Sequence, residues 1–379
     1  MSFLDGIPVW LKAIYRFYGI LQFSNSHNRL QRILARLWCL PLNVFYIYST
    51  IMWLLKVISS HSSEMIENID LLISLTGVIS MLVSIVSNYH RRNKLKLLLD
   101  KVDDIKTKLS SREKQPLLNW IQIALVFPVL INYLFFFFSD SYLRYVFYNY
   151  IPLGMGFLTH SFLANILNEI RNLFSTINQA FQKQVDANSV DLSKIFPFTN
   201  PEKLKKFKKA ETSFTIRQTE QLASIYYDLV TIVVQINVLF NVTTMVSLVM
   251  WFGFVMDTSY DFVYFLVNKE EPEPLLEFWY MEAHFVFFVL WFFAFMRMFS
   301  DTQKMSNRTV SYIHDLWNQY AVRGEVDGRV RHLQFVSTKM LNIKVRFTAQ
   351  DFFHLDWTFC HTMMAAVTTY LVVLIQFHI

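Results

Sequence analysis

The sequence predicts an all-α membrane protein with seven transmembrane helices, its N-terminus in the cytoplasm and its C-terminus outside the cell. The chain is 54% hydrophobic and only 17% charged, whereas soluble domains carry roughly 25% charged residues. Seven apolar segments come close to the length of about 20 residues that crosses a hydrocarbon core. The lysines and arginines gather on one side of these segments, which gives the predicted orientation.

The seven predicted spans are placed by length and hydropathy. They cover residues 35–57, 71–87, 120–138, 145–167, 229–256, 278–298 and 357–377. The second span is short and rich in serine. Residues 1–34 carry four basic residues and do not resemble a cleavable signal peptide, so we expect a cytoplasmic N-terminal segment.

Positive charge assigns the loops to the two sides. It falls in residues 1–36, 88–118, 168–228 and 297–350, which hold 32 of the 35 lysines and arginines. The other three are Lys56, Arg144 and Lys269. The positive-inside rule therefore places the N-terminus in the cytoplasm.

This orientation argues against a G-protein-coupled receptor, whose N-terminus is outside, and the third span has no Asp-Arg-Tyr motif. A transporter is the second alternative, but the chain shows no internal repeat.

Three inner segments are too long to be simple connectors. Segments 88–118 and 300–346 carry apolar residues at helical spacing among lysines and arginines. Residues 161–187 are expected to continue the fourth helix inward, and 203–228 to form another helix. Amphipathic helices need cover for their apolar faces. They either lie on the membrane surface or pack on one another beneath it.

Two charged regions each allow two interpretations. The lysines of residues 203–209 either only set topology and solubility, or also contact anionic lipid head groups. The acidic outer segment 257–277 either concentrates cations near a pore or merely completes the charge asymmetry. Nucleic-acid binding is not expected, because the pI of about 9.1 comes from the inner loops.

The sequence favours a protein that is not an enzyme and uses no cofactor or metal. It contains no HExxH, P-loop or GxSxG motif. Its two cysteines, Cys39 and Cys360, both lie in predicted spans, which excludes an extracellular disulfide and a CxxC metal site.

Polar and aromatic residues converge in the outer half of spans two to six, where polar groups are costly and often functional. A cavity lined by aromatic side chains and a few polar groups would suit a small organic ligand. The candidate ligand-binding residues are Asn132, Tyr133, Tyr148, Thr244, Ser247, Trp251, Trp279 and Glu282. Asn241 belongs to the same group of polar residues. The alternative is that these residues are interfacial aromatics and polar groups that bond neighbouring helices.

The last span carries one small, polar stripe. Residues Thr362, Ala366, Thr369, Val373 and Gln376 recur at steps of four and three, so they share a helix face. A membrane helix with such a stripe hides it from lipid, against another helix or against water.

The end of this span resembles a family signature. Thr369-Tyr370, five apolar residues and Gln376-Phe377 are similar to the TYhhhhhQF pattern (h, hydrophobic) that closes insect gustatory receptors. The approach, with Phe347-Thr348-Ala349 and Leu355-Asp356, agrees with it, although that family often has glycine where this chain has Asp351. The resemblance implies a tetrameric, ligand-gated cation channel. Residues 299–356 would form a cytoplasmic anchor domain where subunits meet, and 357–379 the pore-lining helix.

The same resemblance implies roles for single residues. Thr369, Val373, Gln376 and Phe377 would line the pore and its outer gate, which passes monovalent cations, with calcium as a further candidate. Leu371 replaces the acidic residue of many sugar receptors, which favours a bitter compound or a sugar such as fructose as the tastant. The implied location is the plasma membrane of sensory neurons, in contact with membrane lipids.

Several alternatives stay open from sequence. The chain could be an odorant-receptor-like channel subunit, or a seven-helix receptor or transporter without a pore. The channel could be a homotetramer or a heteromer with related receptors.

Overall fold

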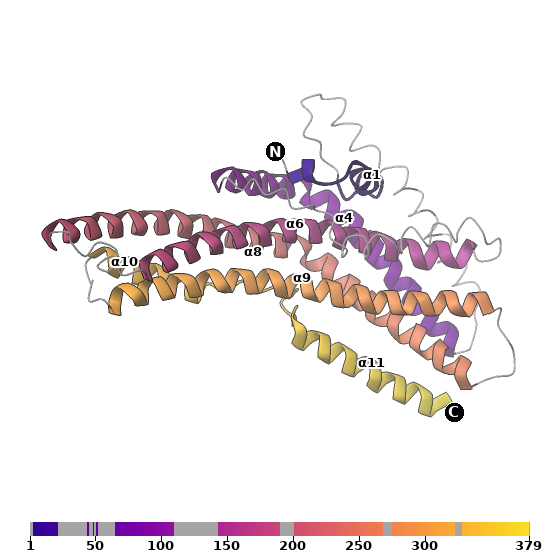
Figure 1. Ribbon diagram of the computed structural model, residues 1–379. Helices are drawn as coiled ribbons and strands as arrows, with labels where there is room; N and C mark the ends of the chain where they lie inside the picture. The colour runs from indigo at the N-terminus through magenta and orange to yellow at the C-terminus, as the bar shows by residue number, and fades with distance from the viewer. Residues whose placement is uncertain are drawn as a thin grey trace, which may run out of the picture.

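A computed structural model of the chain shows long helices packed side by side (Figure 1). It describes residues 3–21, 44, 48, 51, 65–109, 143–189, 201–267, 275–322 and 328–378. The long helices are α4 (Met65–Lys108), α6 (Leu143–Ser189), α8 (Pro201–Val267) and α9 (Leu275–Val322). The shorter elements are η1 (Phe3–Gly6), α1 (Val9–Phe17), α10 (Gly328–Asn342), β1 (Thr348–Ala349), β2 (Phe353–His354) and α11 (Trp357–His378).

The four long helices join a predicted span to a predicted inner helix without interruption. The 67 residues of α8 make a helix roughly 100 Å long, about three times the thickness of a hydrocarbon core. The predicted inward continuation of the fourth span is present, because α6 runs to Ser189. The fifth span and the helix expected before it form the single helix α8, which also continues past residue 256 to Val267.

Five of the seven predicted spans coincide with described helices, namely α4, α6, α8, α9 and α11. The spans at 35–57 and 120–138 lie outside the described residues, apart from three isolated helical positions in the first. Within the described part of the chain, Arg217–Tyr260 is the one stretch whose length and hydropathy alone suit a membrane crossing, and Trp357–Val373 is a shorter apolar stretch.

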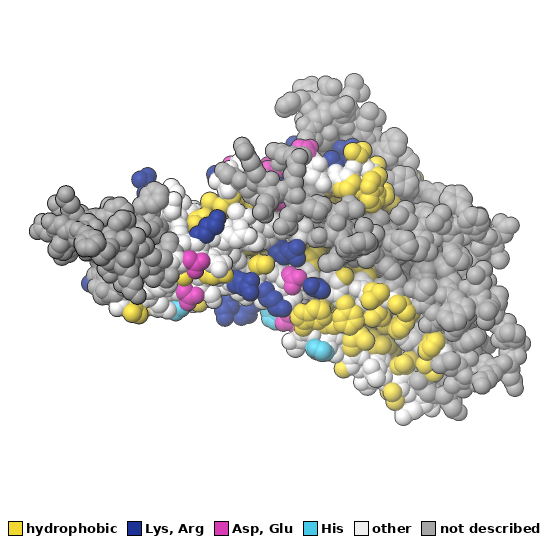
Figure 2. Space-filling view, viewed as in Figure 1, with side chains coloured by type: hydrophobic (Ala, Val, Ile, Leu, Met, Phe, Trp, Pro, Cys, Tyr) yellow, Lys and Arg dark blue, Asp and Glu magenta, His cyan; other side chains and the backbone are white. Residues whose placement is uncertain are grey.

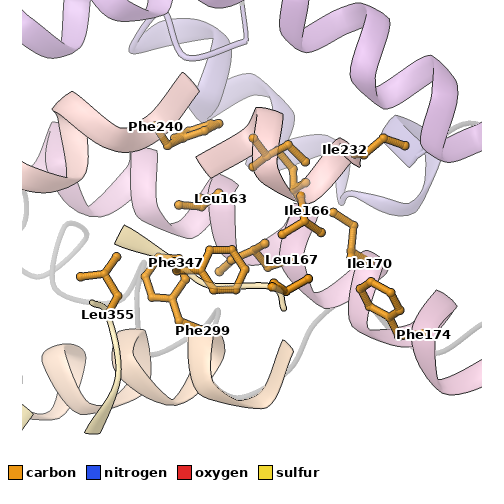
Figure 3. Close-up of a cluster of buried hydrophobic side chains, with 14 of the residues drawn as sticks. Leu163, Ile166, Leu167, Ile170, Phe174, Ile232, Phe240, Phe299, Phe347 and Leu355 are labelled. Atoms are coloured by element: carbon orange, nitrogen blue, oxygen red, sulfur yellow. The ribbon is translucent and has the colours of Figure 1, made fainter. Parts of the chain in front are cut away.

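The core runs along the contacts of α6 with α9 and of α4 with α8. Figure 3 shows its centre, where Leu163, Ile166 and Leu167 of α6 meet Phe299 of α9 and Phe347. Phe299 and Phe347 pack with ring centroids 4.8 Å apart. Burial of this continuous apolar surface holds the inner helices to one another, so they do not depend on a membrane surface for cover.

The N-terminal segment is part of this core. Tyr15 of α1 is fully buried, and its hydroxyl lies 2.8 Å from the Ser161 hydroxyl and accepts a bond of 3.0 Å from the Asn165 amide. Burial raises the pKa of Tyr15, since the phenolate would lose its hydration. The backbone N–H of Phe3 donates to the Asp103 carboxylate at 2.6 Å. The segment 3–21 is therefore a packed element.

A small antiparallel hairpin, β1–β2, interrupts the region where the sequence predicted only anchor helices. Thr348 pairs with His354 and Ala349 with Phe353. Gln350 and Asp351 between the strands have φ values of 51° and 57°, which is the left-handed geometry that tight hairpin turns require. The hairpin ends directly before α11, so it determines where that helix begins.

Candidate functional site

The last helix, α11, leaves the bundle at an angle (Figure 1). It packs on α8 and α9 through Phe359, Cys360 and Val367, which are buried. On the face shown in Figure 2, charged side chains gather over the middle of the molecule, whereas the region of α11 is hydrophobic or uncharged. This helix thus combines attachment at one face with a wide uncharged surface.

The predicted stripe lies on that free surface. Thr362, Thr369 and Gln376 are exposed in the single chain, Ala366 is half-buried and Val373 is 40% exposed. The side chain of Phe377 lies outside the described residues. The stripe is therefore directed away from the helices to which α11 is attached, as it must be if it faces another copy or water.

Threonine hydroxyls of α11 are satisfied within the helix. Thr369 donates to the Ala365 carbonyl at 2.9 Å, and Thr368 to the Met364 carbonyl at 2.9 Å. Such internal bonds remove the cost of placing a hydroxyl in an apolar environment. Tyr370 of the signature is 56% exposed and lies edge-on to Phe252 of α8, with ring centroids 6.2 Å apart.

The base of α11 is fixed to α8 by polar contacts. Asn237 bonds the Thr348 hydroxyl at 3.3 Å and accepts the Thr348 backbone N–H at 3.4 Å. Asn241 accepts the backbone N–H of Gln350. Asn241 was expected among the ligand-lining groups, but its amide oxygen holds the hairpin.

Asp351 stands where gustatory receptors often have glycine, and its backbone explains both residues. At a φ of 57°, glycine carries no steric cost, and aspartate is among the side chains that tolerate this region. Asp351 also accepts a bond of 2.8 Å from the Thr348 hydroxyl. Five residues further along the chain, Asp356 accepts the Phe359 N–H at 3.0 Å and caps α11.

Three ligand candidates lie together on one buried face of α8. Thr244, Ser247 and Trp251 are spaced by three and four residues and are all buried. A Cβ on Gly156 of α6 would lie 3.5 Å from the Ser247 hydroxyl, so this hydroxyl faces α6. The Ser247 hydroxyl has no hydrogen-bond partner, which leaves it available to a ligand.

A path of aromatic contacts joins this face to the base of α11. Trp251 stacks on Phe292 of α9 with centroids 4.0 Å apart. Phe292 lies 6.4 Å from Phe359 of α11, and Phe359 lies 5.3 Å from Phe353 of the hairpin. Displacement of Trp251 can therefore reach α11 through direct packing.

The remaining candidates are not tested by these contacts. Asn132 and Tyr133 lie outside the described residues. Tyr148 falls on α6, and Trp279 and Glu282 fall on α9, but their side chains are outside the described part of the structure.

The sequence reasoning missed a second polar group, in the half of the bundle nearer the hairpin. His160 of α6 is fully buried against the stacked rings of Trp291 and Phe295, at centroid distances of 5.3 and 4.5 Å. Arg91 of α4 is also buried, with its guanidinium carbon 3.9 Å from the centre of the Phe240 ring. The rule that ionisable residues in spans are often functional would have identified His160. No sequence signal places Arg91 beside it.

Comparison with solved structures defines the class of this fold. The chain is similar to the insect olfactory receptor OR5 from Machilis hrabei in complex with eugenol, with a TM-score of 0.64 and 12% identity over 97% of this chain and 98% of that one. A second structure of OR5 from Machilis hrabei matches with a TM-score of 0.56 and 13% identity, again over 97% of this chain and 98% of that one. The chain thus has the fold of a seven-helix insect receptor.

The family follows from the sequence. The 7tm chemosensory receptor family matches residues 11–379, and the chain belongs to that family, whose members are multi-pass membrane proteins. It is also 36% identical over 74 residues to putative gustatory receptor 28b of Drosophila melanogaster. That aligned segment covers 20% of this chain and 15% of the fly receptor. The resemblance seen in the last span is confirmed as a family relationship.

Proposed function

We propose that this chain is a gustatory receptor that acts as a tastant-gated, non-selective cation channel. The observation that carries the proposal is the polar stripe of α11, which is free in the single chain while the base of the helix is fixed to the bundle. Four copies around one axis would bring Thr369, Val373, Gln376 and Phe377 to a shared pore. The four Val373 and four Phe377 side chains around the axis would close the pore by excluding water, and the four Gln376 amides would contact a hydrated cation.

The proposed orientation follows the positive charge. The N-terminus and residues 299–356 lie in the cytoplasm, where α10 and the inner ends of α6, α8 and α9 make the anchor domain between subunits. The C-terminus of α11 lies outside. The receptor works in the plasma membrane of sensory neurons, as a homotetramer or with related receptors.

The proposed ligand site is the buried face of α8 with Thr244, Ser247 and Trp251. The unpartnered Ser247 hydroxyl and the Trp251 ring supply one polar and one aromatic contact, which suits a small organic tastant such as a bitter compound or fructose. Asn132, Tyr133, Tyr148, Trp279 and Glu282 complete the proposed set. A ligand that binds the open state better shifts Trp251 and Phe292, and the Phe359 contact transmits this shift to α11.

An odorant-receptor-like channel is the second candidate, favoured by the fold shared with OR5. The gustatory role is preferred because Thr369-Tyr370 and Gln376-Phe377 match the gustatory signature and because the 36% identical segment belongs to a putative gustatory receptor.

The test is whole-cell current in a heterologous cell with G-protein signalling blocked, during perfusion of a tastant and odorant panel. We expect a tastant-evoked cation current whose permeability ratios change in Gln376→Ala. Thr369→Ala and Thr368→Ala form a matched pair, since both hydroxyls bond within the helix but only Thr369 lies on the stripe. Permeability should change in the first and not in the second.

Surface expression with tastant binding but without current would overturn the self-sufficient channel. A response to odorants alone would favour the second candidate.

A further inference from the structure

A group of buried nitrogen atoms without partners lies where α4, α6, α8 and α9 meet. These atoms are Nε and Nη1 of Arg91, Nδ2 of Asn88, both imidazole nitrogens of His160 and Nε1 of Trp291. All four side chains are at least nine-tenths buried. A buried polar group without a partner destabilises a fold by about 1–3 kcal/mol, so several in one place indicate a binding site.

The four side chains form two contacting pairs on helices that pack together. Arg91 Nη2 donates to the side-chain amide oxygen of Asn88. The His160 and Trp291 rings pack with centroids 5.3 Å apart, and α6, which carries His160, packs on α4, which carries Arg91. Phe240 covers one face of the Arg91 guanidinium. The region next to it toward the hairpin is the apolar core of Figure 3, to which Phe240 belongs.

Five of the six free atoms can donate. Guanidinium, amide and indole nitrogens only donate, and neutral imidazole offers one donor and one acceptor. The charge has no protein counterpart, because no carboxylate in the described residues lies within ion-pair distance of Arg91. Glu169 and Asp301, further along α6 and α9, pair with Lys106 and with Arg171 and Arg297. Burial lowers the pKa of Arg91 to about 9, so the guanidinium stays charged at neutral pH.

We propose that Asn88, Arg91, His160 and Trp291 form a binding site for an oxyanion, a phosphate or carboxylate group. Acceptor oxygens with negative charge complement the free donors in the group, and Nε and Nη1 of Arg91 can each donate a charge-assisted hydrogen bond. The site uses residues other than the proposed tastant contacts Thr244, Ser247 and Trp251, and does not depend on channel activity.

Two sources can supply the oxyanion. Arg91 lies four residues beyond the end of the second predicted span, or about 6 Å along the helix. The Arg91 backbone is therefore near the level of the lipid head groups, while its side chain packs on Phe240 within the fifth predicted span, so a phospholipid phosphate would bind between the helices. A small soluble phosphate or carboxylate is the other source.

The test uses the full-length protein in an uncharged detergent, with thermal unfolding followed by tryptophan fluorescence. Sodium phosphate is compared with sodium chloride at equal ionic strength, and dihexanoyl phosphatidic acid with dihexanoyl glycerol. A ligand that binds only the folded state raises the unfolding midpoint with its concentration. We expect this for the native protein with phosphate, with phosphatidic acid or with both, and the response identifies the source.

Arg91→Gln should weaken oxyanion binding about tenfold or more, since it removes a charged donor. Arg92→Gln is the matched control: it removes the same charge one residue away, where the guanidinium stacks on Tyr89 at 4.1 Å, and should bind like the native protein. In chloride alone, Arg91→Gln should unfold at or above the native midpoint, because an unpaired buried charge is gone.

Trp291→Phe removes only the indole donor and keeps the ring, so it tests the site if Arg91→Gln does not fold. It should weaken binding several-fold. Equal midpoints in oxyanion and control solutions for the native protein would overturn the proposal. So would an oxyanion response in Arg91→Gln as large as in Arg92→Gln.

Discussion

The two halves of the helix bundle treat buried polar groups differently. In the half near α10, Asn178 donates to the Met305 carbonyl at 3.0 Å and accepts the Thr309 hydroxyl at 2.6 Å, and Tyr226 pairs with Ser306 at 3.3 Å. In the other half, Ser247, His160 and Trp291 have buried polar atoms without partners. Both halves are closely packed, and the other half also contains bonded groups such as Tyr15 with Ser161 and Asn165, but among the described residues these unpartnered atoms lie in that half.

This difference separates support from recognition. A buried network that is fully bonded fixes one conformation, whereas free buried donors and hydroxyls are stabilised only when something binds. The half near α10, which is the inner half in the proposed orientation, therefore holds the helices in place, and the free polar atoms of the half with the predicted spans are candidates for ligand contact.

The largest effect is expected from the inner half. Phe174→Ala removes a fully buried ring that contacts Tyr226 at 5.8 Å, and should lower stability by about 3–5 kcal/mol. The measurement is the unfolding midpoint and yield of purified protein. Val234→Ala, at a half-exposed position of α8, should change stability by less than about 0.5 kcal/mol. Equal effects would contradict a core in this half.

Breaking the inner polar network should have the next largest effect. Asn178→Ala leaves the Met305 carbonyl and the Thr309 hydroxyl with fewer partners and should cost about 1–3 kcal/mol. Adding Thr309→Val removes one of those groups, so the double variant should lose less than the sum of the single variants. Strict additivity would show that the network does not act as a unit.

A pair of serines compares the halves directly. Ser306→Ala deprives Tyr226 of its partner and should cost about 1 kcal/mol, whereas Ser247→Ala removes a hydroxyl without a partner and should cost less than about 0.5 kcal/mol. Ser247→Ala should instead reduce tastant sensitivity, measured from the concentration that evokes half-maximal current. Unchanged sensitivity would remove Ser247 from the ligand site.

The smallest effect on stability is expected from a glycine substitution in the hairpin that joins the halves to α11, with a valine substitution as its contrast. Asp351→Gly should stay within about 0.5 kcal/mol of the native stability, because glycine accepts positive φ while the Thr348 bond is lost. Asp351→Val should cost about 1–2 kcal/mol, since a branched side chain is strained at this φ. Unfolding midpoints of both variants check the order, and equal values would argue against the left-handed turn.

Much of this architecture is readable from the sequence, because its signals are long. Apolar runs locate the helices of five spans, and the terminal Thr369-Tyr370 and Gln376-Phe377 pairs indicate the family before any comparison. The uninterrupted joining of inner helices to spans was predicted for α6, where no proline or glycine follows Gly156 in the helix.

Other features depend on contacts that no local pattern encodes. The hairpin escaped prediction because its strands are two residues each, too short for an alternating pattern. Asn241 was grouped with the ligand candidates because the sequence indicates its position within the span but not that the hairpin backbone lies beside it. Arg91 follows its span like any inner arginine, and only the packing of α4 on α8 places it under Phe240.

The continuity of α8 links events at its two ends. One helix carries Trp251 near one end, the asparagines that hold the hairpin in the middle, and the residues after Pro201 at the other end. If a ligand at Trp251 tilts this rod, whatever binds its far end senses the change, and thermodynamic linkage makes the influence mutual. A partner that binds the Pro201 end would therefore change the affinity of the receptor for tastant. Tastant binding would change the affinity for that partner by the same ratio.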